Sequence, residues 1–154
     1  MVLSEKKREI IERVGVFHEK KGMQPVVGRI IGLLMVAEPA EATFEEIQEE
    51  LQVSKSAVSN ALTFMQGREM VDYTTKPGER KRYFKLSVKK WKKDLNRDFD
   101  GLLKIDVLLD EVIELKENKN SEFCQCLQEM KDFLGFLKVE LPLLLKKFEA
   151  TRKK

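Results

Sequence analysis

The segment 43–65 most constrains what this chain can fold into, because two short stretches with helical spacing stand on either side of a break of a few residues. Thr43 and Glu46 have the spacing of a capping box, which marks the start of the first stretch. Its apolar positions recur every three or four residues: Phe44, Ile47 and Leu51. Ser54 is well placed to cap a second helix that runs to about Glu69. The sequence therefore predicts two helices joined by a tight turn.

The spacing of apolar residues then changes from helical to alternating. The stretches "MVDYTT" and "KRYFKL" read as two short strands around "KPGE". Pro77 followed by Gly78 fits the two central positions of a type II turn. A β-hairpin directly after two helices joined by a turn is typical of a winged helix-turn-helix.

The second helix of this motif carries many residues that are poor choices for a helix interior. Its core stripe is apolar and consists of Val58, Ala61, Leu62 and Met65. Short polar or basic side chains fall on the opposite face: Lys55, Ser56, Ser59, Asn60 and Thr63. Such side chains can bond base edges or phosphates without holding the helix away from a surface. For any one of them, ordinary solvent exposure explains as much, but five on one face indicate DNA contact.

The basic charge is concentrated after this helix. Between Arg68 and Arg97 there are 11 Lys and Arg against 4 Asp and Glu, although the whole chain has a net charge of only +3. A polyanion-binding surface has this pattern, and so does a solvated, lysine-rich helix face. The hairpin carries four basic residues that we expect to touch DNA: Lys76, Arg80, Lys81 and Arg82. The first helix of the motif is expected to expose an acidic face that stays off the phosphates: Glu45, Glu46, Glu49 and Glu50.

Two helices are expected before the motif. The first runs from a cap at Ser4 to about Lys21, with Ile10, Val14 and Phe17 on its apolar side. The second, "PVVGRIIGLLMVA", is apolar almost all round and should be a buried central helix that begins with a first-turn proline. Gly28 and Gly32 would let another backbone approach it closely.

The last third of the chain is expected to form two long amphipathic helices. Val88, Leu95, Leu102 and Leu109 repeat every seven residues along one helix that ends near "NKNS". Ser121 caps the last helix, which Pro142 should kink. Its apolar seam steps by four and three: Phe123, Leu127, Met130, Leu134, Leu137, Leu141, Leu144 and Phe148. We read these helices as a dimerisation unit, with folding back onto the winged part as the alternative.

The predicted fold class is therefore mainly α with a small β-hairpin wing, in two parts. Residues 1–87 form a winged helix-turn-helix DNA-binding domain with an N-terminal helix, and residues 88–154 form a helical dimerisation region.

Several classes of protein are disfavoured. The chain has one histidine, His18, and no glycine-rich loop after a strand, since "GRIIG" lies inside a helix, so we expect no enzyme, no cofactor and no metal site. Cys124 and Cys126 are two positions apart on a helix and cannot easily bridge, which fits thiols in a reducing compartment. The N-terminus lacks the apolar stretch of a signal peptide, and the longest unbroken apolar run is far too short to span a bilayer. A cytoplasmic protein without membrane association is expected.

Residues 25–86 resemble the MarR superfamily of winged-helix transcriptional regulators, and in particular its GbsR-type branch. The marks are "GRIIG" from Gly28 to Gly32, "LQVSKSAVSNAL" from Leu51 to Leu62, and "PGERKRYF" from Pro77 to Phe84. By this resemblance the five polar residues named above lie in a DNA-recognition helix. Glu79 and Arg80 match an acidic–arginine pair of the wing, in which the arginine reaches DNA and the acid steadies it.

The resemblance also implies partners. The family works as homodimers on imperfect palindromes in double-stranded DNA, often as repressors that a small ligand releases. For the GbsR-type branch that effector is a quaternary ammonium compound held in an aromatic box by cation–π attraction. Trp91, Phe99 and Tyr83 are the aromatics near the junction of wing and C-terminal helices, although Trp91 and Phe99 suit plain core packing better. The effector and its residues are left unassigned.

Two other classes of function stay open. A winged helix can act as a protein–protein interaction module without specific DNA binding, with the acidic helix as its contact surface. A purely structural coiled-coil protein would explain the last third of the chain but would leave the wing without a purpose.

Overall fold

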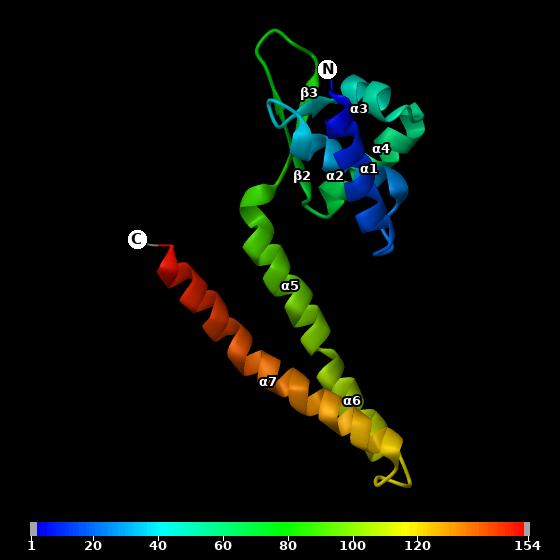
Figure 1. Cartoon of the computed structure of the whole chain (residues 1–154), viewed down its shortest axis with the longest axis vertical. Coiled ribbons are helices and arrows are strands. Elements are labelled where there is room, and N and C mark those ends of the chain that lie inside the picture. Colours follow the sequence, from blue (N-terminus) through cyan, green and yellow to red (C-terminus); the bar gives the residue numbers. More distant parts are fainter. Residues whose placement is uncertain (1–2, 153–154) are drawn as a thin grey trace. The chain divides into compact units, whose positions relative to one another are not determined.

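The computed structural model describes residues 3–152 and divides into two compact units, one that extends to Lys90 and one that begins at Trp91 (Figure 1). This boundary lies three residues after the one expected from the sequence. Each unit has its own apolar core.

The first unit is built around a buried central helix. Helix α1 (Glu5–Glu19) begins where the Ser4 hydroxyl accepts a hydrogen bond from Lys7 N–H, and α2 (Pro25–Val36) packs along it. The close approach of these helices depends on two glycines of α2. A Cβ at Gly28 would lie 2.9 Å from the Gly15 carbonyl oxygen, and one at Gly32 would lie 2.9 Å from Ile11 Cα. The predicted packing role of both glycines is confirmed.

The apolar side of α1 differs in one place from the expectation. Ile11 and Gly15 are the residues of α1 that are buried, Ile10 and Val14 are half-buried, and Phe17 is 55% exposed. The buried side is shifted by one position because the helix packs on α2 through the small surface of Gly15. Phe17 instead stacks under the Lys21 ammonium, which lies 4.4 Å from the ring centre.

The two helices of the central motif are present as expected. Helix α3 (Phe44–Leu51) begins with the complete capping box of Thr43 and Glu46. Gln52 takes a left-handed conformation, with φ of 51°, and this residue turns the chain into α4 (Lys55–Gly67). The Ser54 hydroxyl accepts from Ala57 N–H and so caps α4 as predicted.

The hairpin follows α4, and a third strand joins it. Strands β2 (Val71–Thr75) and β3 (Arg82–Leu86) pair antiparallel, and the two-residue strand β1 (Ala42–Thr43) pairs with the other side of β3. Strand β1 is not predictable from the sequence pattern, because two residues are too few to show an alternation. The turn has the expected type II character, with Gly78 at φ of 81° and a hydrogen bond from Glu79 N–H to the Lys76 carbonyl. The chain therefore has a winged helix-turn-helix fold, mostly helical with a small three-stranded sheet.

One apolar core holds this unit together. It draws on all four helices and on the sheet, and its fully buried large side chains are Ile30, Leu33, Leu34, Ile47, Met65, Val27 and Val58. Phe84 of β3 is 5% exposed and joins the same core, so the wing is fixed to the helices by its central strand.

The second unit contains three helices instead of the expected two. After a short 3-10 helix (Val88–Lys90) that closes the first unit, α5 (Trp91–Leu103) and α6 (Ile105–Glu114) are separated by a break at Lys104, and α7 (Glu122–Thr151) runs through Pro142. The single helix predicted after Ser87 is wrong in this respect. The break changes the phase of the heptad pattern, so Leu109 is buried while Leu102 is 52% exposed.

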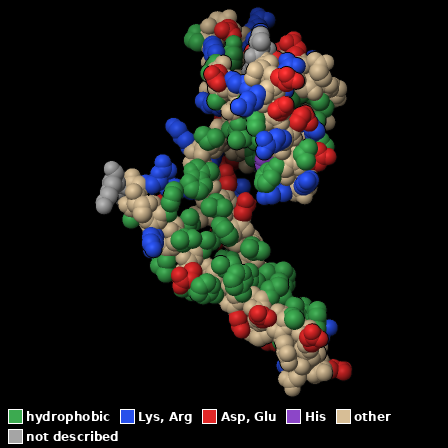
Figure 2. Space-filling view, viewed as in Figure 1, with side chains coloured by type: hydrophobic (Ala, Val, Ile, Leu, Met, Phe, Trp, Pro, Cys, Tyr) green, Lys and Arg blue, Asp and Glu red, His purple; other side chains and the backbone are tan. Residues whose placement is uncertain are grey.

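The predicted apolar seam of α7 divides into two faces. Leu127, Leu134 and Leu137 pack in a small core with Leu103 and Leu109. Leu95, Phe99, Ile113, Leu141 and Leu145 are half-buried. Many other large apolar side chains of the unit lie exposed, and Figure 2 shows apolar side chains in green along it. The exposed ones of α6 and α7 are Ile105, Val107, Leu108, Val112, Phe123, Met130, Phe133, Phe136, Val139, Leu143, Leu144 and Phe148.

Two further features of the described residues bear on the predictions. Cys124 is buried, Cys126 is exposed, and both are free thiols. No helix within residues 3–152 combines the length and the apolar content that crossing a bilayer requires.

Candidate nucleic-acid interface

Helix α4 presents two contrasting faces. Its apolar face is locked into the core of the first unit, where Val58, Ala61, Leu62 and Met65 are at most 3% exposed. The five polar residues predicted for the opposite face are all exposed: Lys55, Ser56, Ser59, Asn60 and Thr63. Positions separated by three or four residues lie on one side of a helix, so these side chains share one surface. A rigid helix with a polar, uncrowded face is therefore available to a partner.

The N-terminal end of α4 adds a local feature. Ser54 and Ser56 hydroxyls lie 3.0 Å apart and share a hydrogen bond, while Lys55 stands exposed beside them. The N-terminus of a helix carries unpaired backbone N–H groups and a partial positive charge that favour phosphate. Hydroxyls, a lysine and this helix end together form a surface suited to a phosphate backbone.

The hairpin places a second set of basic groups at the wing. Arg80, Lys81 and Arg82 are exposed in the segment that leads from the turn into β3. Arg82 stacks over the Tyr73 ring at 4.7 Å. The Tyr73 ring lies 6.1 Å from that of Phe84 and is 42% exposed. Within the described part of the chain, Arg80 and Lys81 form no ion pair, so their charges are available to a polyanion.

Lys76, the fourth predicted wing contact, has a different environment. Its ammonium lies 2.9 Å from the Glu41 carboxylate and 3.7 Å from the centre of the Tyr83 ring. The hydrogen bond to Glu41 raises the pKa of Lys76 above its usual value. Glu41 could not be predicted as a partner, because its loop has no pattern that indicates a contact with a hairpin some 35 residues further along the chain.

The acidic partner expected for Arg80 is engaged elsewhere. The Tyr83 hydroxyl donates a hydrogen bond to Glu79 at 2.5 Å, and this bond raises the pKa of Tyr83. The turn directs the Glu79 side chain back along β3 toward Tyr83. The ion pair with Arg80 that the family resemblance implied does not occur among the described contacts, and Glu79 steadies Tyr83 instead.

The acidic face of α3 is smaller than expected. Glu45 and Glu49 are exposed, as predicted. Glu46 is half-buried in the capping box, and the Glu50 side chain is only 9% exposed, with a carboxylate oxygen 3.2 Å from the Arg8 guanidinium. Two of the four carboxylates are thus engaged in contacts that stabilise the fold, which leaves Glu45 and Glu49 as the exposed acidic side chains of this face.

His18 has the surroundings of a structural residue. Its ring packs edge-on against Phe17, with ring centres 5.3 Å apart. Partial burial, and to a lesser extent the positive charge of nearby Lys21, lowers the pKa of His18. Within residues 3–152, no group of three or more His, Cys, Asp and Glu is placed to hold a metal ion.

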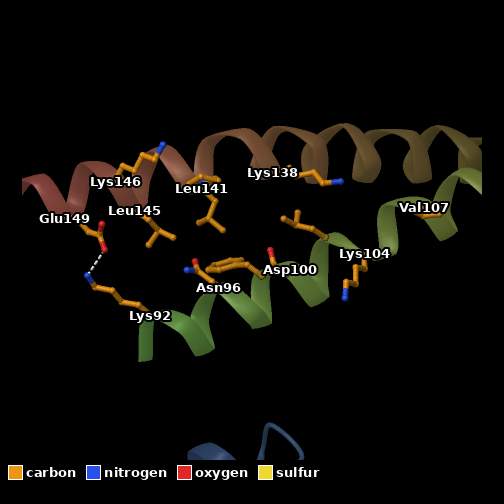
Figure 3. A pocket seen from close by; sticks show the side chains of 13 residues that line it. Lys92, Asn96, Asp100, Lys104, Val107, Lys138, Leu141, Leu145, Lys146 and Glu149 are labelled. Atoms are coloured by element: carbon orange, nitrogen blue, oxygen red, sulfur yellow. Dashed lines mark hydrogen bonds and ion pairs between the residues drawn. The ribbon is translucent and has the colours of Figure 1, made fainter. Parts of the chain in front are cut away.

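The second unit contains a slot of about 760 Å³ between α5 and α7 (Figure 3). Leu141 and Leu145 point from α7 into the gap, and the ion pair between Lys92 and Glu149 spans it at 2.8 Å. Its apolar lining consists of Phe99, Leu103, Val107, Leu141, Pro142 and Leu145. This volume lies in the range of small-molecule sites.

The aromatic residues considered for an effector have separate roles. Phe99 lines the slot, and Trp91 packs edge-on against Phe148 with ring centres 6.5 Å apart. Tyr83 already holds the Lys76 ammonium on its ring face.

Comparison with known proteins adds relatives at low identity. No protein-family model matches the chain. It is 21% identical over 129 residues to the HTH-type transcriptional regulator MmpR5 of Mycobacterium tuberculosis, a match that covers 84% of this chain and 78% of that protein. A solved structure described as a transcriptional regulator aligns over 94% of this chain and 99% of its own, with a TM-score of 0.69 and 19% identity. The structural similarity shows a shared fold, and both relatives are transcriptional regulators.

Proposed function

We propose that this chain is a sequence-specific DNA-binding transcriptional regulator of the MarR type, and that it reads DNA with α4. The observation that carries the proposal is the division of α4 into a face fixed in the core and a face of five exposed, short polar or basic side chains. A helix of this kind fits the major groove, where Asn can pair with adenine, Lys with guanine, and Ser or Thr with either bases or phosphates. The similarity to MmpR5 supports the same class of function.

The wing supplies the part of the affinity that does not depend on sequence. Arg80, Lys81 and Arg82 are exposed at one end of the sheet, and cations at this position bind phosphates or enter the minor groove. Neutralising phosphates releases condensed counterions, so binding should weaken steeply with salt.

A homodimer is part of the same proposal. Along α6, Ile105, Leu108, Val112 and Leu115 are 38–84% exposed and follow the three-and-four spacing of a coiled-coil seam. Monomeric proteins rarely leave such a stripe uncovered. A second copy that covers it would give a two-fold symmetric regulator, with half-sites about 10 bp apart on an imperfect palindrome.

Repression and its release by a small ligand are proposals that rest on the family resemblance. The slot between α5 and α7 is the candidate place for an effector, because its size suits a small organic compound and its lining combines apolar side chains with polar and charged ones. The GbsR-type branch, with its quaternary ammonium effectors, stays a prediction from the sequence motifs. The proposed location is the cytoplasm.

The competing proposal is a protein-interaction module that uses the acidic face of α3. Its support is reduced, because Glu46 and Glu50 are engaged in contacts within the chain and only Glu45 and Glu49 remain exposed.

Selection from a pool of random duplexes tests the proposed function. The full-length protein is incubated with the pool at about 0.1 M salt, and bound duplexes are amplified and sequenced. We expect enrichment of one imperfect palindrome with half-sites about one helical turn apart. A pool that stays random after repeated rounds would contradict sequence-specific binding.

A further inference from the structure

Four residues at the base of the wing form one connected cluster, which we call the wing latch: Glu41, Lys76, Glu79 and Tyr83. The turn of the hairpin contributes Lys76 and Glu79 from its two ends. Glu41 comes from the loop before β1, and Tyr83 comes from the central strand β3. The cluster therefore joins the hairpin to the loop before β1, two segments that are separate in the sequence.

Tyr83 is the centre of the latch. Its ring face carries the Lys76 ammonium at 3.7 Å, and its hydroxyl donates to Glu79 at 2.5 Å. The turn is also closed by the hydrogen bond from Glu79 N–H to the Lys76 carbonyl. Because both ends of the turn converge on one side chain of β3, the turn is held against this strand, and Arg80 and Lys81 lie in the short segment between the turn and the strand.

Glu41 links this arrangement to the recognition motif. Its carboxylate lies 2.9 Å from the Lys76 ammonium, and it directly precedes β1, whose Thr43 pairs with Tyr83 in the sheet and caps α3. A short path of contacts thus runs from the wing through Lys76, Glu41 and β1 to α3, which leads into α4. Two DNA-contacting surfaces must keep a fixed spacing to engage one duplex together, and this path can set that spacing.

We propose that Lys76 and Glu41 are positioning residues, which hold the wing at the distance from α4 that DNA binding requires, and that Lys76 does not itself bind phosphate. This inference rests on the proposed DNA-binding function. This proposal replaces the sequence-based prediction that Lys76 is one of four wing residues that contact DNA. The raised pKa of Lys76, caused first by its hydrogen bond to Glu41, agrees with a charge that is used within the protein.

The effect of Glu41→Gln on DNA affinity separates positioning from simple electrostatics. Removing an acid near a DNA-binding surface should raise the affinity for a polyanion if charge alone matters. The latch predicts the opposite sign, a loss of about three- to tenfold, because the wing is no longer held. Glu45→Gln is the matched control, since Glu45 is exposed on α3 outside the latch and its loss should leave the affinity equal or slightly higher.

A double-mutant cycle tests the connection between the two residues. Lys76→Met and Glu41→Gln should each weaken binding, and the double variant should be no weaker than Lys76→Met alone, because both changes break the same contact. Lys85→Met is the matched control for the loss of a wing cation, since Lys85 is exposed on β3 and takes no part in the latch. Its effect should add to that of Glu41→Gln. Additive losses for Lys76→Met and Glu41→Gln would overturn the proposal.

Hydrogen exchange of the free protein provides a test that needs no DNA. The segment 76–82 should exchange faster in Glu41→Gln and in Lys76→Met than in the wild type, and at the wild-type rate in Lys85→Met and Glu45→Gln. Equal exchange in all five proteins would overturn the latch even if DNA binds. If the two latch variants exchange faster but the wild-type protein does not bind DNA, the wing latch is supported and the proposed function is refuted.

Discussion

The Glu46 carboxylate accepts a hydrogen bond from Thr43 N–H at 2.8 Å, and the Thr43 hydroxyl accepts one from Glu46 N–H at 3.2 Å. These reciprocal bonds satisfy two donors at the start of α3 that would otherwise lack partners. The same two residues join the helix-turn-helix to the sheet, because Thr43 also belongs to β1. The stability of the motif should therefore depend on this contact.

Glu46→Gln should lower the free energy of unfolding at pH 7 by about 1 kcal/mol. The bond from Thr43 N–H lowers the pKa of Glu46 in the folded protein. A lowered folded-state pKa means that the ionised carboxylate stabilises the fold above its unfolded-state pKa, and that this contribution is lost as the pH falls through the folded-state value. Urea unfolding of Glu46→Gln and the wild type at several pH values from 7 downward measures this difference, which should be largest at pH 7 and should shrink as the pH falls below the unfolded-state pKa. Glu45→Gln, outside the capping box, should unfold with nearly the wild-type free energy at each pH.

Gly28→Ala should destabilise the first unit by several kcal/mol. The added Cβ would lie 2.9 Å from the Gly15 carbonyl oxygen and 3.1 Å from Gly15 Cα, and these backbone atoms can move away only if α1 and α2 separate. Gly101→Ala is the control, because a Cβ there meets nothing within 4 Å and alanine favours a helix. Thermal unfolding should show a lower Tm for Gly28→Ala and not for Gly101→Ala. An unchanged Tm of Gly28→Ala would mean that the packing of α1 on α2 does not require a glycine at this position.

Asn60→Ala and Arg80→Ala should affect DNA binding in different ways. Asn60 lies on the exposed face of α4, so its loss should cost about 1–3 kcal/mol on the preferred sequence and little on random DNA. Arg80 lies at the wing, so its loss should weaken binding to all sequences and reduce the salt slope by about one. Titration of each variant with specific and random duplexes at several salt concentrations measures both effects. If each variant lost the same affinity for specific and for random DNA, α4 and the wing would not have the separate roles proposed here.

Leu108→Glu should convert the protein from a dimer to a monomer. Leu108 is 58% exposed in the apolar stripe of α6, and a carboxylate there would be buried against the second copy. Val88→Glu changes an apolar residue of the first unit that is 66% exposed and should leave the dimer intact. Sedimentation velocity measures the oligomeric state of the two variants and the wild type. A wild-type monomer, or a Leu108→Glu dimer, would show that this stripe is not the interface.

Local chemistry explains why much of the fold could be predicted. The Ser54 cap, the Thr43–Glu46 box and the Pro77–Gly78 turn each involve residues at most three positions apart, and each was found as expected. The exposed face of α4 follows from helical periodicity alone.

The features that the sequence did not show depend on contacts between distant segments. Strand β1 is defined by its pairing with β3, and the environment of Lys76 is defined by Glu41. The break at Lys104 is marked by no proline, and the glycine nearest to it lies three residues earlier, so the heptad repeat appeared to continue. The sequence predicts a single apolar seam on α7, but the helix is apolar on most sides. Its own chain can therefore bury one apolar face and leave another exposed for a second chain.

The most direct test compares the affinity of the full-length protein for two duplexes, the one recovered by selection and a shuffled one of the same composition. Fluorescence anisotropy measures both affinities at salt concentrations from about 50 to about 200 mM. We expect the selected duplex to bind at least about 10³-fold more tightly than the shuffled one, and the logarithm of the binding constant to fall linearly with the logarithm of the salt concentration for both. Asn60→Ala should reduce the difference in affinity between the selected and the shuffled duplex. Equal affinity for both duplexes, or binding that does not change with salt, would contradict the claim that α4 reads DNA sequence.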